Sequence, residues 1–573
     1  MYSEYEIIQM PLTLASCRNR VERFLAKNEL RLDDVGYYAV VSRLGDDTIL
    51  AGGGLDGNII KCIAVDDSLR GTGMSQRLVS HLLSVAQDRG IFNVKVFTKP
   101  QNAAIFSDLS FHTLATAPLA VLMENGMGGL SSYCNYLSSL HTDEGTNGVV
   151  VMNCNPFTLG HKHLIERAAV QVDHLYVIIV KEDKSLFSTR QRTAMARKAC
   201  EDMKNVTVCD GSDYAISAAT FPTYFLKQLT HASDTQMMLD INLFARHIAP
   251  ALNATVRFVG TEPCDELTAR YNELMKQLLP QQGVDVVEID RLALGGSVVS
   301  ASHVRSLIDD EKLAHAVKLV PETSVPYLVS KQAITALRKE LTTTPKPGLI
   351  DTIDNGAHSD MNYDLMLTSI KSLEPYFDQL ALLDAPIASE VQHIGIEAEK
   401  SMLETTGGVN THRGALFSMG IAVVGVSQAL LHGKQWNEIV KNLASDIPAN
   451  RSSYGAMAKA RHNVKGALDV ARGGYDEVSS TWLPFYQSLV GDENAAVKTL
   501  LLIMSQLDDT NIIHRVGFER AQQVKNEATS SLENFSLDKV TALNSRFIQE
   551  NISPGGAADM LALTFFINSI SKH

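Results

Sequence analysis

The sequence predicts a multidomain protein in which two α/β domains, the second of them Rossmann-like, precede an all-α domain. The first observation is length, because 573 residues correspond to about three or four domains of roughly 100–200 residues each. The second is an alternation of strand-like and helix-like segments before residue 331. The third is that strand-like segments nearly vanish from residues 331–573. We therefore place the domains at residues 1–140, 146–330 and 331–573.

Composition excludes several classes of protein. Hydrophobic residues make up 45% and charged residues 20%, enough apolar material for several cores and too much for a disordered chain. The net charge of −13 disfavours a nucleic-acid partner. The seven cysteines include no CxxC pair, which argues against a disulfide framework or a four-cysteine zinc site. With no signal-peptide pattern and no apolar run of about 18 residues, we expect a cytoplasmic protein without a membrane partner.

The first domain is predicted to be mixed α/β. Strands are expected at 37–41, 59–65 and 94–97, and apolar residues recur at helical spacing over 75–88. Glycine and serine accumulate at 126–132, and a second turn-rich stretch follows at 143–148, which places the domain boundary there.

The second domain alternates strands and helices in the manner of a parallel sheet. The expected strands are 148–152, 174–180, 205–210 and 256–260, with an edge-like strand at 284–289. The expected helices are 163–172, 190–203 and one near 221–230. In the third domain, helical stretches are expected at 390–406, 414–431, 494–507 and 537–549.

A glycine-containing turn between strand and helix marks the first domain. Arg70, Gly71 and Gly73 precede the predicted helix, where backbone N–H groups can cradle a phosphate. The turn resembles the pyrophosphate signature of the GNAT acetyltransferases, with Ser75 where that family has glycine or alanine. The resemblance covers roughly residues 1–125 and implies that the domain holds the pyrophosphate of a CoA-like pantetheine arm. A GNAT-like domain that binds nothing is the alternative, and no general base for acetyl transfer stands out.

Two signatures in the second domain indicate nucleotidyl transfer. Thr158, Gly160 and His161 follow the first strand, and a serine-rich segment with Arg305 lies further along the chain. Such a reaction needs donors aimed at the phosphate charge of the transition state. The segments resemble the (His/Thr)-x-Gly-His and Ile-Ser-x-Ser-x-x-Arg motifs of the nucleotidyltransferase superfamily. The resemblance makes His161, Thr158 and Arg305 catalytic, and it assigns ATP binding to Asn155, Gly160, Ser300 and Ser302.

Two further segments narrow the resemblance. Residues 211–225 and 259–263 look like stretches specific to the citrate lyase ligase family, and with the first domain they extend the match over residues 1–330. The family implies a ligase that activates acetate with ATP, forming acetyl-AMP and diphosphate. The acetyl group then passes to the thiol of a CoA-derived prosthetic group on the acyl carrier subunit of citrate lyase.

Clusters of acidic, amide and basic residues characterise the helical domain. Carboxylates suit Mg²⁺, whereas histidine, arginine and lysine suit phosphate oxygens. Together the clusters resemble the triphosphoribosyl-dephospho-CoA synthase family, which implies a transferase that uses ATP and 3′-dephospho-CoA and releases adenine. The candidate residues for substrate or metal are Lys346, Asp351, Asn355, His358, Asp360, Glu404, Asn410, His412, Arg413, Asp508, Asp509, Asn511, His514 and Asp559. Asp508 and Asp509 are the candidate Mg²⁺ ligands.

The helical domain departs from that family at three positions. Leu468 and Val470 replace an expected arginine and glutamate, and Val516 stands where glycine is expected. Asp469 and Arg472 are neighbouring residues that can compensate. The sequence leaves open whether this domain is active.

Two interpretations of the function remain in view. The favoured one is a bifunctional citrate lyase maturation enzyme that uses ATP as substrate, with Mg²⁺ and without a tightly bound organic cofactor. Its expected partners are the acyl carrier subunit with its prosthetic group, acetate and 3′-dephospho-CoA. The alternative is an adenylyltransferase of the pantetheine or nicotinate type, with a degenerate helical domain used only for docking.

Overall fold

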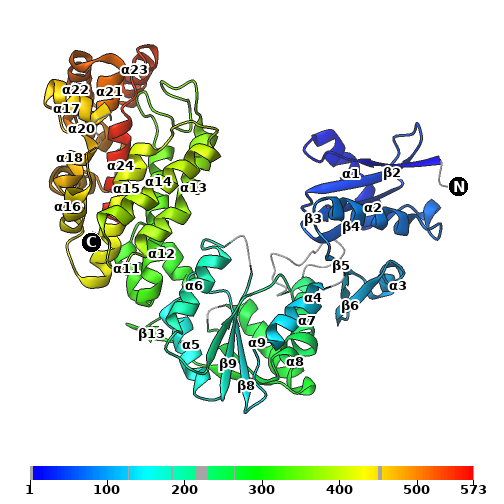
Figure 1. The fold of residues 1–573 in the computed structure, drawn as a ribbon. Helices are drawn as coiled ribbons and strands as arrows, with labels where there is room; N and C mark the ends of the chain where they lie inside the picture. Colours follow the sequence, from blue (N-terminus) through cyan, green and yellow to red (C-terminus); the bar gives the residue numbers. More distant parts are fainter. Residues whose placement is uncertain are drawn as a thin grey trace. The chain divides into compact units, whose positions relative to one another are not determined.

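The computed structural model describes residues 4–126, 128–181, 185–214, 230–263, 265–449 and 454–571. They form two compact units, each described here by itself (Figure 1). The first unit comprises Met1–Asn155 and Gly160–Val298, and the second comprises Pro156–Leu159 and Val299–His573. The boundary between the two compact units therefore lies just before the serine-rich segment that contains Arg305.

The first sheet of the first unit has seven strands in the order β1-β2-β3-β4-β5-β7-β6. Neighbours are antiparallel except β4 and β5, which pair in parallel through Ile59↔Lys95 and Ile60↔Val96 and are unpaired beyond. The strands are β1 (Tyr5–Gln9), β2 (Tyr37–Arg43), β3 (Ala51–Asp56), β4 (Ile59–Val65), β5 (Val94–Thr98), β6 (Phe111–Ala117) and β7 (Ala120–Asn125). Helices α1 (Ala15–Lys27), α2 (Met74–Asp88) and α3 (Ala103–Ser107) accompany them.

The second sheet is parallel, in the order β10-β9-β8-β11-β12. Chain order runs outward from β8 to β10 and resumes at β11 on the other side, so the switch point lies between β8 and β11, where ligands bind in such sheets. The strands are β8 (Asn147–Met152), β9 (His174–Ile179), β10 (Val206–Cys209), β11 (Ala254–Gly260) and β12 (Asp285–Ile289). The helices are α4 (Gly129–Ser138), α5 (Leu159–Ala169), α6 (Thr189–Ala199), α7 (Thr230–Leu243), α8 (Ala249–Ala251) and α9 (Glu266–Leu278), and the short strands β13 (Ala293–Leu294) and β14 (Ser297–Val298) follow.

The two sheets of the first unit share a core. Helix α7 packs against β6, and one cluster of buried apolar side chains runs from Met10 to Val284. Polar contacts reinforce the junction: Lys95 Nζ donates to the Asp213 carboxylate at 2.8 Å, and Tyr214 donates to the buried Glu124 carboxylate. The two α/β layers are therefore joined by a continuous interior.

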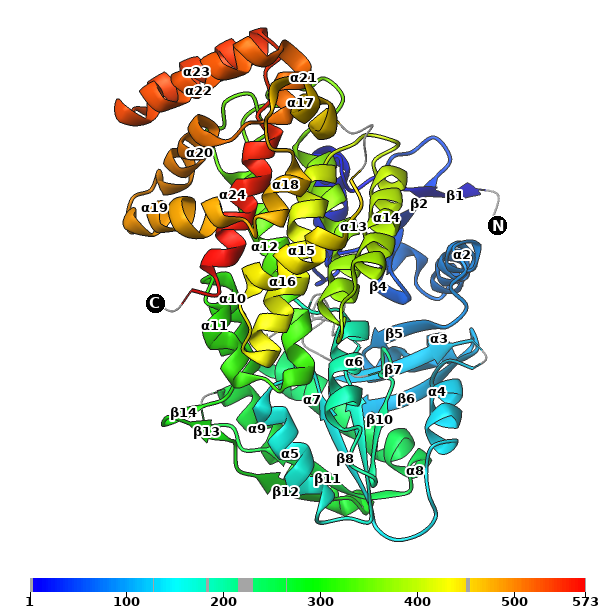
Figure 2. The ribbon, with the colours of Figure 1, turned by 60° about the vertical axis from the view of Figure 1, so that its left-hand side comes forward.

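In the second unit, the described residues 299–449 and 454–571 form helices joined by loops, without a β-strand among them. Helices α12, α15 and α24 pack on one another at its centre, and α15 and α24 lie side by side in both views (Figures 1 and 2). Helix α15 is apolar and long enough to cross a membrane, but 72% of its apolar stretch is buried among its neighbours, as expected of a core helix. The helices are α10 (Ala301–Asp309), α11 (Leu313–Ala316), α12 (Val325–Thr342), α13 (Tyr363–Ala381), α14 (Ala388–Thr405), α15 (Arg413–His432), α16 (Trp436–Asp446), α17 (Tyr454–His462), α18 (Ala467–Arg472), α19 (Leu483–Ser488), α20 (Ala495–Gln506), α21 (Thr510–Val516), α22 (Phe518–Glu533), α23 (Leu537–Gln549) and α24 (Gly555–Asn568).

The predicted elements are confirmed wherever the structure describes them, usually to within a few residues. The edge-like strand at 284–289 is the edge strand β12. The helix expected at 163–172 begins earlier, at Leu159, because the signature loop turns directly into it. Most of the helix expected near 221–230 lies outside the described residues.

Candidate active sites

The loop between β8 and α5 is held in place by a buried arginine. Arg192, fully buried on α6, donates through Nη1 to the carbonyl of Asn153 at 2.6 Å and to that of Val180 at 2.7 Å. Asn155, predicted to bind ATP, accepts a hydrogen bond from the backbone N–H of Phe187 at 3.1 Å. The loop is thus fixed to the carboxyl end of β9 before any ligand binds.

His161 lies in the first turn of α5, close enough to a second arginine to be affected by its charge. Burial and the guanidinium of Arg291 lower the pKa of His161 to about 4. Arg291 follows β12 and is itself fixed, because its Nε donates to the carbonyl of Thr261 at 2.8 Å and its Nη2 pairs with Glu262. A neutral imidazole and a fixed guanidinium therefore lie at the carboxyl edge of the parallel sheet, near its switch point.

Most of the remaining signature residues lie in the second unit. Thr158 is buried, and its neighbour Phe157 accepts a hydrogen bond from the Ser324 hydroxyl at 3.0 Å. Ser300 caps α10 by accepting from the backbone N–H of His303 at 3.2 Å, and its hydroxyl lies 3.2 Å from that of Ser302. Arg305 lies on the same helix, whereas Gly160 is the second residue of α5.

The glycine turn of the first sheet follows the carboxyl end of β4, where β4 and β5 are no longer paired. Gly71 and Gly73 have φ of 76° and 80°, which L side chains rarely adopt. Gly73 precedes α2 and supplies no side-chain cap, so the first N–H groups of α2 have no capping side chain. Arg70 is exposed and pairs with Asp67 at 2.8 Å. The turn therefore offers backbone donors and one exposed cation.

In the second unit, a buried ion pair lies under the loop between α12 and α13. The Lys346 ammonium, 1% exposed, pairs with the buried Glu340 carboxylate and donates to the carbonyl of Glu340 at 2.8 Å. Asp351 organises the loop, because its carboxylate accepts from the Thr344 hydroxyl at 2.6 Å and from the N–H of Ile353 at 2.7 Å. Lys346 is thus positioned by Glu340, and Asp351 has a structural role.

Two aspartates lie where three helices begin. Asp509 caps α21 by accepting from the N–H of Asn511 at 2.9 Å, and its other oxygen accepts from the N–H of Ala557 in α24 at 3.0 Å. Asp559 accepts from the N–H of Ala415 in the first turn of α15. A Cβ at Gly414 would collide with the Asp559 carboxylate, so glycine is required there.

The carboxyl groups of this cluster repel one another. Burial, with the nearby Asp509 and Glu340, raises the pKa of Asp559 well above its usual range. Burial likewise raises the pKa values of Asp509 and Glu340. Tyr475 is close enough for Asp559 to raise its pKa further, and its buried hydroxyl has no hydrogen-bond partner. Carboxyl groups gathered in this way favour either the binding of a cation or the acceptance of a proton from a substrate.

His412 adds a donor near the same cluster. Thr411 donates to the Ser369 hydroxyl at 2.6 Å, which leaves that hydroxyl to donate to His412 Nδ1 at 2.8 Å. Nε2 of His412 then carries the proton, and it is buried without a partner. Burial and Lys346 lower the pKa of His412 to about 3, so the ring is a neutral donor. An orphaned buried donor fits an anionic ligand.

The other predicted residues of the helical domain are more dispersed. His358 receives a hydrogen bond from Arg515 at 3.4 Å and lies 2.8 Å from the Ser553 hydroxyl. Asp508 pairs with Lys525 at 2.6 Å. The remaining candidates are exposed: Asn355, Asp360, Glu404, Asn410, Arg413, Asn511 and His514. Asn355 and Asp360 line a wide depression of about 450 Å³ before α13.

The two residues expected to compensate for Leu468 and Val470 have structural roles. Asp469 caps its own helix, α18, by accepting from the N–H of Gly466 at 3.1 Å. Arg472 donates to the carbonyls of Ala444 and Ile447 at the end of α16, at 3.1 and 2.7 Å. Neither side chain therefore takes the place of a substrate ligand in this arrangement.

Four side chains beside the predicted site residues were missed in the sequence: Arg192, Arg291, Glu340 and Tyr475. Each lies in an ordinary helical or loop context, and its importance comes from what tertiary packing brings beside it. Only Tyr475 carried a weak sequence signal, because it follows two glycines.

The described residues contain no group of three side chains arranged to hold a metal ion. Both oxygens of Asp509 accept backbone N–H groups, and Asp508 is paired with Lys525. Asp559 has one backbone donor and acidic neighbours, so it is the carboxylate whose surroundings best fit a cation. Mg²⁺ needs only one or two carboxylates when phosphate oxygens complete its shell.

Replacing Asp509 with alanine is expected to destabilise the helical unit by about 2–3 kcal/mol, because capping is lost and buried N–H groups lose their acceptor. Amide hydrogen exchange on the full chain measures this locally. We expect faster exchange at Asn511, Ile512 and Ala557, whose N–H groups the carboxylate accepts. The matched control is Asp508→Ala, which removes a half-exposed ion pair and should leave these amides unchanged. Equal acceleration in both variants would refute the capping role.

Comparison with known proteins divides the chain near residue 327, about thirty residues after the boundary between the two compact units. A family model described as the citrate lyase ligase C-terminal domain matches residues 147–328, and one described as ATP:dephospho-CoA triphosphoribosyl transferase matches residues 326–573. A citrate (pro-3S)-lyase ligase of Haemophilus influenzae is 40% identical over 314 residues, covering 54% of this chain and 94% of that protein. A 2-(5''-triphosphoribosyl)-3'-dephosphocoenzyme-A synthase of Pectobacterium atrosepticum is 30% identical over 302 residues, covering 48% of this chain and 97% of that protein.

Among solved structures, pantothenate synthetase from Thermus thermophilus covers 36% of this chain and 73% of that chain at 16% identity, with a TM-score of 0.23, which is too low to support an argument. The two curated relatives, by contrast, are matched over nearly their whole lengths, and the two family models meet near residue 327. The chain therefore belongs to the citrate lyase ligase family in its N-terminal part and to the ATP:dephospho-CoA triphosphoribosyl transferase family in its C-terminal part, and it is an enzyme that joins a ligase to a transferase.

Proposed function

We propose that the chain matures citrate lyase through two reactions. Its N-terminal part acetylates the thiol of the prosthetic group on the citrate lyase acyl carrier subunit, with acetyl-AMP as intermediate and AMP and diphosphate as products. Its C-terminal part joins ATP and 3′-dephospho-CoA into 2′-(5″-triphosphoribosyl)-3′-dephospho-CoA and releases adenine. The observation that carries the proposal is the fusion itself, because two matched enzyme families both handle one CoA-derived group.

In the ligase reaction, an acetate oxygen attacks the α-phosphorus of ATP and the bond to diphosphate breaks. Neutral His161 donates a hydrogen bond to the phosphates, and the nearby Arg291 guanidinium supplies fixed positive charge. Thr158, Asn155 and Gly160 shape the phosphate loop. Ser300, Ser302 and Arg305 at the start of α10 are assigned to the β- and γ-phosphates, which helix N-termini favour.

In the transferase reaction, a ribose hydroxyl of dephospho-CoA attacks C1′ of the ATP ribose and adenine leaves. Asp559, with its raised pKa, is a carboxylate basic enough to take the hydroxyl proton. His412 Nε2–H and Lys346 lie near each other and are donors for the retained triphosphate. When bound, Mg²⁺ would neutralise triphosphate charge and would be held mainly by the phosphate oxygens, which leaves Asp559 to take the proton.

The glycine turn after β4 is proposed to hold the pantetheine arm of the prosthetic group. Arg70→Ala and Gly73→Ala should leave acetyl-AMP formation intact and raise the KM for the acyl carrier about tenfold, since a charge-assisted contact contributes about 1.5–3 kcal/mol when not fully exposed. Arg18→Ala is the matched control, because Arg18 is also a half-exposed arginine in an ion pair. Equal loss of both steps would count against the turn as a carrier site.

Two assays on the full chain test the proposed function. The first measures acetate-dependent exchange of diphosphate into ATP, and the second measures adenine release from ATP with dephospho-CoA. Exchange driven by pantetheine phosphate or a nicotinate nucleotide in place of acetate would support an adenylyltransferase instead, which the near-complete match to a ligase disfavours. Absence of adenine release would point to a docking role for the helical unit. We place both reactions in the cytoplasm, where ATP and CoA precursors are available.

A further inference from the structure

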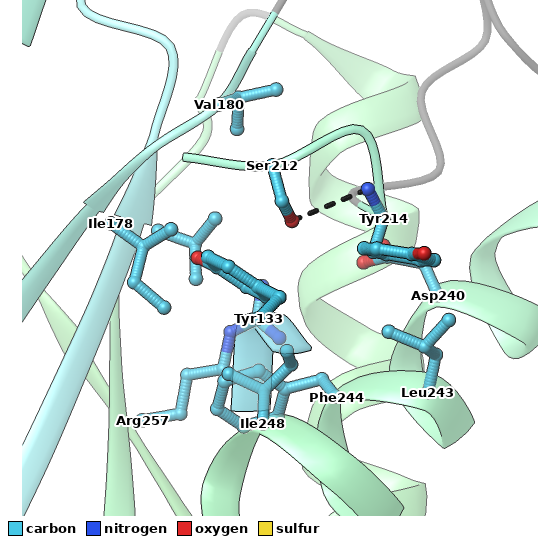
Figure 3. A pocket seen from close by; sticks show the side chains of 11 residues that line it. Tyr133, Ile178, Val180, Ser212, Tyr214, Asp240, Leu243, Phe244, Ile248 and Arg257 are labelled. Atoms are coloured by element: carbon cyan, nitrogen blue, oxygen red, sulfur yellow. Dashed lines mark hydrogen bonds between the residues drawn. The ribbon is translucent and has the colours of Figure 1, made fainter. Parts of the chain in front are cut away.

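A small cavity lies in the first unit between the parallel sheet and the helices that cover it (Figure 3). Its volume is about 30 Å³. Val151 of β8 and Ile178 of β9 form one wall, and Leu243 and Phe244 at the end of α7 form another. The ring of Tyr133 closes it, and the side chain of Arg257 lies below that ring in Figure 3. The cavity is therefore mostly apolar, and its polar lining consists of the Arg257 guanidinium, the Asp240 carboxylate, the Ser212 hydroxyl and two tyrosines.

Arg257 is buried with donors left over. It projects from β11 and is 4% exposed. Its Nε and Nη1 are buried without hydrogen-bond partners, while Nη2 donates to the Tyr271 hydroxyl at 3.4 Å. Its guanidinium lies 4.2 Å from the centre of the Phe244 ring. A buried guanidinium with unmet donors is destabilising unless a ligand accepts from it.

The acid nearest to Arg257 is already engaged. Asp240 lines the same cavity, and its carboxylate accepts from the Tyr271 hydroxyl, to which Arg257 Nη2 donates. The Nε and Nη1 donors of Arg257 have no hydrogen-bond partner among the described residues. The site therefore holds a positive charge whose missing partner is an oxygen anion.

The ligand that fits is a short carboxylate. Guanidinium groups bind carboxylates through paired N–H donors, and the apolar walls suit a methyl group. One water molecule needs about 10–15 Å³ of cavity volume, so this cavity admits a ligand of only a few non-hydrogen atoms. Resting on the proposed function, we propose that this cavity is the acetate site of the ligase, with Arg257 as the residue that binds the acetate carboxylate.

The place of the cavity in the fold agrees with this role. Val180 and Ser212, which also line it, follow the carboxyl ends of β9 and β10, and Val151 precedes the phosphate loop by two residues. A carboxylate paired with Arg257 keeps a second lone pair on each oxygen, and one oxygen attacks the α-phosphorus while the bond to diphosphate breaks. The small volume also gives a reason for a two-carbon acid rather than a longer one.

The experiment is acetate-dependent exchange of diphosphate into ATP by the full chain. Arg257→Gln is expected to raise the KM for acetate about 10–100-fold, in line with a lost charged hydrogen bond, and to leave the KM for ATP within about twofold. Arg257→Lys should recover part of the loss. The matched control is Arg246→Gln, an exposed arginine in the same helical turn as Phe244 but outside the cavity lining, which should change neither value. Saturation-transfer NMR with acetate alone gives a second readout, with signal expected for the wild type and lost in Arg257→Gln.

A second variant keeps the proposal testable if Arg257 variants do not fold. Ile178→Val enlarges the cavity by one methylene and should raise kcat/KM for propionate relative to acetate about tenfold. An unchanged acetate KM in folded Arg257→Gln, or an unchanged propionate preference in Ile178→Val, would overturn the acetate site. A wild-type chain without any acetate-dependent exchange would instead overturn the proposed ligase function, which separates the two failures.

Discussion

Replacing His161 with alanine is expected to lower acetate-dependent exchange of diphosphate into ATP by about 10²–10³-fold. One preorganised hydrogen-bond donor to transition-state charge contributes that much in comparable sites. The pKa of about 4 makes the imidazole neutral at pH 7, so it acts through its N–H and not through a full charge. The effect should fall mainly on kcat, because the donor is aimed at charge that develops during the reaction.

The matched control is His163→Ala, two residues along α5 and partly buried like His161. That variant should retain exchange within about twofold, since His163 is given no contact with the phosphates in the proposed reaction. Adenine release by the same two proteins should be unaffected, which shows that the chain is folded. Comparable losses in both variants would contradict a specific role for His161.

Replacing Asp559 with asparagine is expected to abolish most adenine release, by about 10²–10⁴-fold, while the ligase reaction persists. A positioned general base contributes a factor of that order. The change is isosteric and removes one of three mutually repelling acids, so thermal stability should be unchanged or higher. A loss of activity without a loss of stability distinguishes a catalytic role from a structural one.

Asp538→Asn provides the control, because Asp538 is an exposed acid in the first turn of α23 in the same unit. It should leave adenine release unchanged. If Asp559→Asn released adenine at the wild-type rate, the base would have to be sought elsewhere in the cluster, with Glu340 as the next carboxyl to replace.

The sequence was enough to predict the order of elements, because their hydrophobic periodicities are strong. The parallel sheet, the edge position of β12 and the long core helix α15 all follow from local pattern. It was also enough to locate the phosphate loops, whose glycines and hydroxyls are local signals. Both families were identified from such segments.

The local sequence pattern did not predict which distant residues shift the pKa values of the predicted site residues. Arg291 lies 130 positions from His161 in the chain, yet its charge contributes to the low pKa of His161. Glu340 and Tyr475 likewise matter because distant parts of the second unit bring them close to Asp559. The sequence predicts Asp351 and Asp509 as substrate or metal ligands, and the structure adds that their carboxylates accept backbone N–H groups, which local pattern did not show.

The continuous interior of the first unit has a consequence for how this chain can change over time. A recombination event between residues 126 and 147 would separate β6 from α7 and leave apolar faces of both layers in water. A segment that carries the ligase intact between genes therefore includes the residues before 147 as well as the matched stretch 147–328, which contains Ser300, Ser302 and Arg305. Residues that share this hydrophobic core therefore have to be inherited together, including those outside the matched family domain.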